Sequence, residues 1–294
     1  MCGRFTLHAP PDVLQEHFGV DEAPAMPASY NIAPSQDIAV VRAGGGRRHM
    51  ALLRWGLVPA WAKEVKSGYS MINARAETVA DKPTYRTAFK HKRCLIPTTG
   101  FYEWKREGSA KVPYHIRMPG SEVFAFAGLW DRWERDGEGF DSCSIIVTAA
   151  NPDIQPIHDR MPVILNPAQY NSWLNPGQFN RPQLESLLVP FAGQLETFPV
   201  SRRVNSPAND DPRCILPQSQ PGDQRLPRLE QEPVAVRVEQ LDRHAFIAAG
   251  LARLQRAVGV GVVPDRALDR PRRGGLVPKV QVEVHGCSIQ ELDL

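Results

Sequence analysis

The chain has 294 residues, of which 42% are hydrophobic and 8% aromatic, so it can bury the core of one large or two modest domains. It contains neither an apolar run long enough for a membrane helix nor the basic and apolar segments of a signal peptide, so we expect a cytoplasmic protein without a membrane partner. The net charge of +3 is too small to indicate a nucleic-acid partner by itself, and five widely spaced cysteines without a Cys/His cluster predict reduced thiols, no metal and no cofactor.

The sequence begins "MCGRF", which places a cysteine second. Removal of Met1 would leave Cys2 with a free α-amine beside its thiol. The reference pKa is about 7.7–8.0 for such an amine and about 8.5 for a thiol, so an appreciable fraction of each is nucleophilic near neutral pH. The alternative is that Cys2 is only the small second residue of an ordinary chain start.

Short strands dominate the chain as far as residue 217. Runs of β-branched and aromatic residues predict strands within residues 37–43, 49–58, 92–105, 112–118, 123–133 and 142–150. Helix signals are fewer and lie in residues 9–20, which end near Gly19, and in residues 166–174, which open with Asn-Pro. Because the strands do not alternate with helices, we predict an α+β fold: a compact single domain with a largely antiparallel strand core flanked by short helices.

Two strand-like stretches carry polar residues. In "SMINARAET", Asn73, Arg75 and Glu77 occupy alternate positions and would share one face of an extended segment, although a solvated strand face has the same pattern. In "GFYEWK", Glu103 lies between two aromatic residues, and such surroundings would raise its pKa toward the range useful for proton transfer. Strand alternation could instead point Glu103 at water.

A loop after the strongest apolar strand carries further titratable residues. "IVTAANPDIQPIHDRMPVIL" contains His158, Asp159 and Arg160 in succession. Histidine titrates near neutral pH and can act as an acid or a base, but a loop histidine flanked by charges is often only a surface residue.

The composition changes near Pro217. From Gln218 to the end the only aromatic residue is Phe246 and the only lysine is Lys279, against ten arginines. We therefore expect a domain over residues 2–217 and, over residues 218–294, a Pro/Gln-rich linker and an Arg- and Pro-rich tail that is disordered or partly helical.

Seven stretches resemble, in order and spacing, the SOS-response-associated peptidase (SRAP) family of abasic-site processing proteins: "MCGRF", "YNIAPSQ", "WGLVPAW", "INARAET", "FYEWK", "VTAANPDIQPIHDRMPVIL" and "FPVSRRVN". The resemblance covers residues 2–217. It implies a compact α+β domain with a basic groove for single-stranded DNA, acting in the SOS response to DNA damage. A monomer is expected.

In this family the amino-terminal cysteine, freed by removal of the first methionine, captures the ring-opened aldehyde of an abasic site as a covalent thiazolidine that shields the lesion. Hydrolase or protease chemistry is implied only for the removal of Met1. Whether that removal is autocatalytic, and whether the protein also cleaves the strand as a lyase, the sequence leaves open.

The resemblance assigns roles residue by residue. Cys2 matches the nucleophile, and Asn73 matches the asparagine that hydrogen-bonds the captured sugar and the thiazolidine. Glu103 matches the acid/base that promotes ring opening and imine formation, and His158 matches the histidine that assists proton transfer and reversal of the crosslink. The residues expected to contact DNA are Arg4, Trp61, Arg75, Thr148, Asn151 and Arg160.

Two other classes of function compete with this reading. "MCG" also opens amidotransferases of the N-terminal-nucleophile kind, in which Cys2 would attack a glutamine amide, but the substrate-binding motifs of those enzymes are not found after the cysteine. A noncatalytic module that binds single-stranded DNA would leave Asn73, Glu103 and His158 without a shared purpose.

Overall fold

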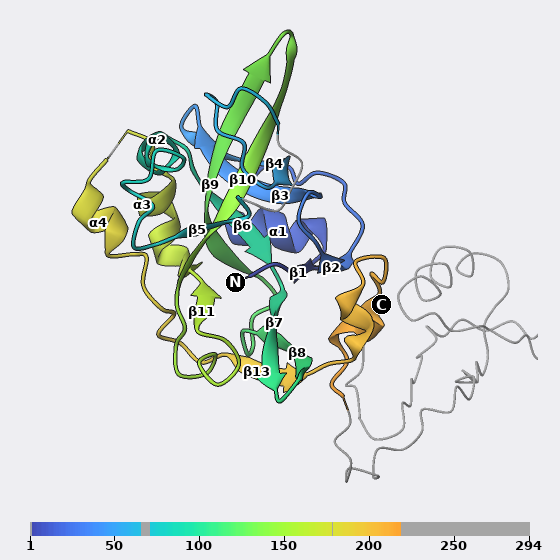
Figure 1. Ribbon diagram of the computed structural model, residues 1–294. Coiled ribbons are helices and arrows are strands. Elements are labelled where there is room, and N and C mark those ends of the chain that lie inside the picture. The colour runs from blue at the N-terminus through green and yellow to red at the C-terminus, as the bar shows by residue number, and fades with distance from the viewer. Residues whose placement is uncertain (1, 66–70, 178, 219–294) are drawn as a thin grey trace, which may run out of the picture. The chain divides into compact units, whose positions relative to one another are not determined.

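The computed structural model describes residues 2–65, 71–177 and 179–218 (Figure 1). The expected tail therefore lies outside the described residues, apart from Gln218. Within the described ranges, no helix is long and apolar enough to cross a membrane.

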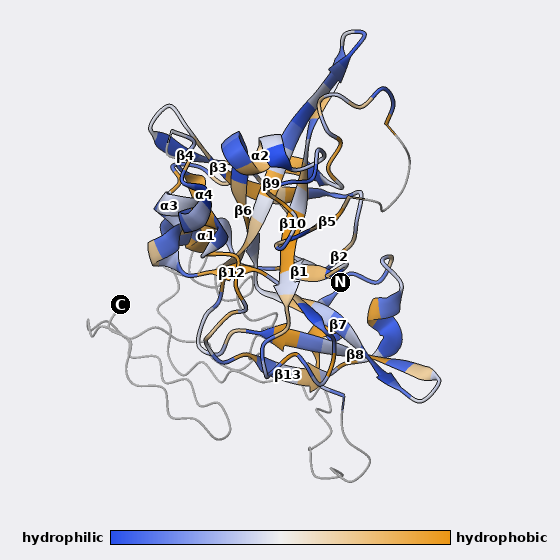
Figure 2. Cartoon of the chain, turned by 60° about the vertical axis from the view of Figure 1, so that its left-hand side comes forward, coloured by the Kyte–Doolittle hydropathy of each residue, from blue (hydrophilic) through white to orange (hydrophobic). Residues whose placement is uncertain are grey.

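Five strands close into a barrel-like ring. β10 (Glu138–Ala149) pairs with β4 (Arg47–Trp55), β4 with β3 (Asp37–Gly44), β3 with β6 (Arg93–Thr98), and β6 with β9 (Phe124–Arg135), which returns to β10. All of these pairings are antiparallel except that of β10 with β4. The β9–β10 hairpin extends beyond the ring, and Figure 2 shows that its tip is hydrophilic whereas β10 becomes hydrophobic nearer the core.

Three short strands extend the same sheet. β5 (Asn73–Arg75) pairs in parallel with β10, β11 (Arg160–Pro162) pairs with β10 in antiparallel fashion, and β12 (Ile164–Leu165) pairs with β9. β5 and β11 therefore both lie against β10, although the chain separates them widely.

A second, five-stranded antiparallel sheet lies beside one end of the barrel (Figure 1). Its order is β13 (Glu196–Pro199), β8 (Ala110–Arg117), β7 (Gly100–Glu107), β1 (Phe5–Leu7) and β2 (Ser29–Ile32). β7 follows β6 after a single residue, so this chain segment passes directly from the barrel into the second sheet.

The helices are short. α1 begins after Pro10, and its C-cap Gly19 adopts a left-handed φ of 60° that favours glycine, as the sequence predicts. The helical segments are α1 (Pro11–Phe18), α2 (Arg86–His91), α3 (Tyr170–Leu174), α4 (Arg181–Glu185) and the 3₁₀ turns η1 (Pro167–Gln169), η2 (Arg202–Asn205) and η3 (Pro212–Ile215).

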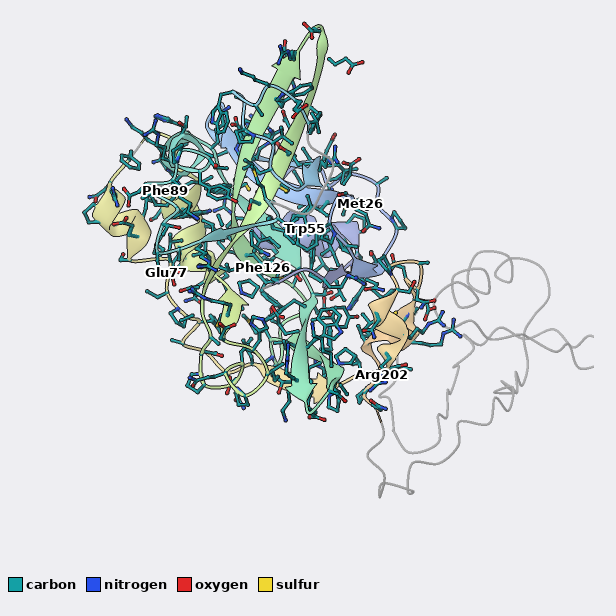
Figure 3. The ribbon with its side chains drawn as sticks, in the orientation of Figure 1. Met26, Trp55, Glu77, Phe89, Phe126 and Arg202 are labelled. Carbon is teal, nitrogen blue, oxygen red and sulfur yellow. The ribbon has the colours of Figure 1, made fainter. Side chains whose placement is uncertain are left out.

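Aromatic side chains join the two sheets. Phe5 of β1 contacts Trp55 and Phe126 of the barrel edge-on, with ring centroids 5.2 and 6.1 Å apart, and Phe101 of β7 lies 5.7 Å from Phe126. All four rings are fully buried, and Figure 3 shows Trp55 and Phe126 near the middle of the domain. Burying such rings contributes on the order of 2 kcal/mol each, so the core fixes where β1 lies.

The predicted α+β class with a largely antiparallel core is confirmed, and each predicted strand and helix has its counterpart. One local expectation is wrong: β5 ends at Arg75, and Glu77 lies in the turn that follows, because the Thr78 N–H turns back to the Arg75 carbonyl.

The last described segment is bonded to the start of the chain. Arg4 donates to the Val204 carbonyl at 2.8 Å and to the Asn31 Oδ1 at 2.7 Å. Asp210 accepts hydrogen bonds from the Ser29 hydroxyl and from a neighbouring backbone N–H of β2. The segment from η2 to η3 is therefore hydrogen-bonded to the edge of the second sheet formed by β1 and β2.

Because these contacts are complete by Gln218, a chain ending there should fold. We expect its unfolding temperature to stay within about 4 °C of the full chain's, the shift that roughly 1 kcal/mol causes in a domain of this size. Thermal melting followed by circular dichroism checks this. The control is a chain ending at Ser201, which lacks the buried Val204 and Cys214 and should lose its cooperative transition. A matching loss in the longer chain would contradict the prediction.

Candidate functional site

Cys2 lies at the meeting point of the two sheets. Its side chain is fully buried, and its thiol faces the Arg4 carbonyl at 4.0 Å. The Asn73 side-chain amide donates to the Cys2 carbonyl at 2.7 Å. Asn73 is itself held by Tyr85, whose hydroxyl donates to the Asn73 carbonyl at 3.1 Å. The start of the chain is thus fixed by β5.

The strand register explains why Asn73 and two arginines share a face. In the ladders, Arg75 lies opposite Val147 of β10, and Val147 lies opposite Pro162 of β11. Directly opposed residues point to the same side of a sheet, as do residues two apart in one strand. Asn73, Arg75 and Arg160 therefore lie on one face of β5 and β11.

Glu103 is a buried carboxyl group. It lies on β7 opposite Tyr114 of β8 and is 2% exposed, so the alternative in which it points at water is wrong. Burial raises the pKa of Glu103 to about 7, the direction predicted from its aromatic neighbours. At neutral pH this group therefore exists in both its protonated and its ionised forms.

His158 lies beside this carboxyl group, with 3.9 Å between His158 Nε2 and Glu103 Oε2. Burial lowers the pKa of His158, which keeps the ring largely neutral at neutral pH. The Arg160 N–H donates to Nδ1 at 3.0 Å, which implies that the ring proton is on Nε2, the nitrogen nearer Glu103. Asp159 Oδ1 lies 3.0 Å from the same Nδ1 and would favour the doubly protonated ring instead.

The thiol does not keep its reference pKa in the folded domain. Burial, reinforced by the negative charge of Glu103, raises the pKa of the Cys2 thiol far above its ordinary value. In the folded chain that carries Met1, little thiolate is therefore present at neutral pH. A reaction of this thiol requires a neighbouring group to accept its proton, and Glu103 is close enough to affect it electrostatically.

The arginines expected to contact DNA differ in their surroundings. Arg75 is exposed. Arg160 forms an ion pair with Glu77. Burial would raise the pKa of the Glu77 carboxyl group, but hydrogen bonds from its own backbone and from Arg160 outweigh burial and lower it. Arg4 donates to backbone and side-chain oxygens within the domain, so part of its guanidinium stabilises the fold.

The other expected DNA contacts differ in their exposure and in their hydrogen bonds. Trp61 is 65% exposed, in the loop after β4, where neighbouring backbone groups bond to the side chains of Asp131 and Trp133 in β9. Thr148 and Asn151 are buried, and their side chains donate to the backbone carbonyls of residues 188 and 191. These hydrogen bonds stabilise the fold by joining β10 and the loop after it to residues 188 and 191.

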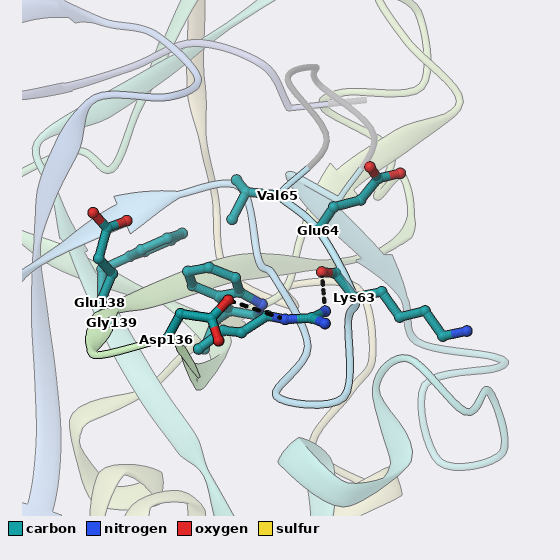
Figure 4. Close-up of a pocket in the computed structure, with 9 residues that line it drawn as sticks. Lys63, Glu64, Val65, Asp136, Glu138 and Gly139 are labelled. Atoms are coloured by element: carbon teal, nitrogen blue, oxygen red, sulfur yellow. Dashed lines mark hydrogen bonds and ion pairs between the residues drawn. The ribbon is translucent and has the colours of Figure 1, made fainter.

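A pocket of about 620 Å³ opens at the acid/base pair. Its walls are formed by Glu103, Trp104, Arg106, Lys111, Ile157, His158 and Asn205. A larger pocket of about 970 Å³ lies under the tip of the β9–β10 hairpin, where Arg135 bonds to the Lys63 carbonyl and to Asp136 (Figure 4). It contains none of the buried titratable groups, so we assign the site to the smaller pocket. Within the described residues, no group of three His, Cys, Asp or Glu could hold a metal ion.

The structure therefore brings together Cys2, Asn73, Glu103 and His158, which come from four separate parts of the chain. Sequence reasoning missed Asp159 as a partner of His158, although it stands next to it. It also missed Arg106 and Lys111. Their signal was present in "KREGSAK": the two residues are equally distant from the two-residue turn at Gly108, so a hairpin places them opposite each other.

Comparisons with known proteins find relatives of this chain. A family model described as SOS response associated peptidase (SRAP) matches residues 1–207. The chain is 46% identical over 222 residues to the Abasic site processing protein YoqW of Bacillus subtilis (strain 168), a match that covers 73% of this chain and 99% of that protein. It is 34% identical over 222 residues to the Abasic site processing protein HMCES of Gallus gallus, covering 64% of this chain and 66% of that one. The crystal structure of a protein from Bacteroides thetaiotaomicron is similar with a TM-score of 0.66 and 26% identity, covering 74% of this chain and all of that chain.

Proposed function

The chain belongs to the SOS-response-associated peptidase family, and from this premise we propose that it processes abasic sites in single-stranded DNA by forming a covalent crosslink through Cys2. The observation that carries the proposal is the position of Cys2, held by Asn73 at 2.7 Å and within the electrostatic reach of Glu103. A buried amino-terminal residue beside an acid/base pair is suited to capture chemistry.

The chemistry balances without a cofactor. Once Met1 is removed, the α-amine of Cys2 adds to the C1′ aldehyde of the opened abasic sugar and loses water, which gives a Schiff base. The thiol then adds across the C=N bond: a C–S bond forms, the nitrogen gains a proton, and a five-membered thiazolidine results. Effective molarities of about 10⁵–10⁸ M for well-placed intramolecular groups favour this closure over a reversible imine.

Glu103 and His158 supply the proton transfers. An abasic sugar is mostly a closed hemiacetal, which must open before the amine can attack. With a pKa of about 7, Glu103 can donate a proton during opening and accept one from the Cys2 thiol during closure. His158, 3.9 Å from Glu103, can exchange that proton and return it when the crosslink reverses.

Asn73 orients the nucleophile. Its amide nitrogen holds the Cys2 carbonyl, whereas its buried Oδ1 has no hydrogen-bond partner among the described residues. A buried acceptor left in this state costs stability unless a ligand satisfies it. We assign Oδ1 to a hydroxyl group of the captured sugar, with Arg75 and Arg160 on the same face contacting phosphates and the exposed Trp61 stacking on a base.

The test is a denaturing gel. Purified protein is incubated with a labelled single strand bearing one abasic site, then heated and resolved, while intact mass spectrometry reads the amino terminus. We expect a heat-stable shifted band and a protein mass lacking Met1. The controls are the same strand with an intact base and the abasic strand whose aldehyde is capped with methoxyamine.

The outcomes separate the competing functions. A shift on native gels alone would indicate a noncatalytic binding module. Glutamine hydrolysis without a crosslink would indicate an amidotransferase. A shortened strand on the same gel would reveal lyase activity, and a chain that retains Met1 yet forms the stable band would contradict the aminothiol mechanism.

A further inference from the structure

Two cations line the site pocket beyond the four clustered residues. Arg106 and Lys111 form part of the wall of the 620 Å³ pocket that also contains Glu103 and His158. Both side chains are exposed, on the hairpin of β7 and β8. The wall between them and the acid/base pair includes Trp104, whose indole N–H donates to Asn205 Oδ1 at 2.9 Å and is thereby fixed.

The hairpin holds these cations directly opposite each other. Residues 107 and 110 flank the two-residue turn, where Gly108 has a φ of 60°, and Arg106 pairs with Lys111 one step further along. Like charges at directly opposed positions destabilise a strand pair. The arrangement therefore has a cost in the free protein, which an anion bound between the two side chains would remove.

Neighbouring charges do not compensate this pair. Lys105, the adjacent residue on β7, has an ion pair with Glu107 at 3.3 Å. Across the described ranges, neither Arg106 nor Lys111 has an acidic group within ion-pair distance. The acid in the pocket, Glu103, has a pKa of about 7 and is only partly ionised at neutral pH, so this end of the pocket is positive.

We propose that Arg106 and Lys111 together bind one backbone phosphate of the single strand beside the abasic nucleotide, and so direct the strand over the β7–β8 hairpin. The inference rests on the proposed function for the identity of the ligand. A phosphodiester fits because arginine offers a planar fork to its oxygens and lysine a mobile point charge. This subsite adds to Arg75 of β5, Arg160 of β11 and Arg4, which directly precedes β1.

The experiment separates binding from chemistry. The probe is a fluorescent single strand with a tetrahydrofuran abasic analogue, which has no aldehyde and cannot crosslink, and affinity is read by anisotropy over a salt series. Arg106→Gln/Lys111→Gln should bind about tenfold more weakly and reduce the salt slope by about 0.7 log units per log unit, the value for one phosphate on a single strand. The control is Lys105→Gln, which removes one positive charge from the same hairpin outside the pocket and should leave the slope unchanged.

Neutral phosphates locate the contact. Methylphosphonates are placed singly on each side of the analogue, and the affinity loss at each position is compared between the wild type and the double variant. One position should weaken the wild type and have no effect on the double variant. Equal losses in both proteins at every position, an unchanged salt slope in the double variant, or an equal effect of Lys105→Gln would overturn the inference. Melting curves confirm that each variant is folded. If the wild type shows this coupling but never forms a heat-stable crosslink with an authentic abasic site, the subsite stands and the proposed chemistry fails.

Discussion

Replacing Cys2 by alanine should abolish the heat-stable crosslink to an abasic strand. The variant keeps the α-amine once Met1 is removed, so it can still form a Schiff base, but it has no thiol to close the ring. Any product should therefore fall apart on heating, unless borohydride is present to reduce the imine. The denaturing gel described above, run with and without borohydride, measures both outcomes.

Two further variants sharpen this prediction. Cys2→Ser should give at most a weaker and more reversible product, because an oxazolidine is less stable than a thiazolidine. Cys143→Ala is the matched control: Cys143 is also free and fully buried, but it lies in β10 within the barrel, and its loss should leave the crosslink intact. A full-strength stable band from Cys2→Ala would refute the proposed mechanism.

Replacing Glu103 by glutamine should slow crosslinking strongly while leaving DNA affinity nearly unchanged. The amide keeps the shape of the side chain but cannot shuttle a proton, and general acid–base catalysis contributes about 10²–10⁴-fold. Single-turnover rates at saturating protein measure the chemical step, and anisotropy with the aldehyde-free strand measures binding. Weaker binding with an unchanged single-turnover rate would make Glu103 a positioning residue instead. His158→Ala should slow formation less than reversal.

The same substitution has a pH signature. Since the pKa of Glu103 is about 7, the proton-donating form prevails below that pH. The crosslinking rate of the wild type should therefore change with pH near pH 7, and the rate of Glu103→Gln should not. Stability follows the same ionisation: a carboxyl group whose pKa rises from 4.5 to about 7 on folding stabilises the fold below pH 4.5, and this contribution is lost as the pH rises through 7. Melting of the glutamine variant should therefore be less sensitive to pH over this range.

Much of the fold was predictable because its signals are local. The strands at residues 37–43 and 142–150 are apolar runs bounded by turn residues, and α1 has a proline start and a glycine stop. The closure of the barrel was not predictable, because it depends on β10 pairing with both β4 and β9. Strands as short as β1 and β5 exist only through such partners and carry too few residues for a periodic signal.

The candidate site likewise has parts that local sequence signals predicted and parts that depend on contacts between distant residues. Motif order identified Cys2, Asn73, Glu103 and His158, and the structure gathers all four. Strand alternation alone left the burial of Glu103 undecided, because burial depends on which sheet packs against that face. The thiol pKa was not predictable for the same reason: a reference value applies to solvent, whereas Cys2 is enclosed by residues remote in sequence.

The hydrogen bonds that hold the amino terminus also determine when, during synthesis of the chain, Met1 is accessible to another enzyme. Asn73 follows Cys2 by 71 positions, and Val204, which binds Arg4, follows that arginine by 200. At roughly 5–20 residues per second, a ribosome needs about 10–40 s to synthesise the intervening chain. For about the first 4–14 s, until Asn73 is made, the amino terminus has neither partner, and until Val204 is made it lacks one of them, so it is open to an aminopeptidase. Afterwards the domain closes over Cys2. Under the proposed function, removal of Met1 by another enzyme would therefore take place during translation, whereas self-removal would take place in the finished domain.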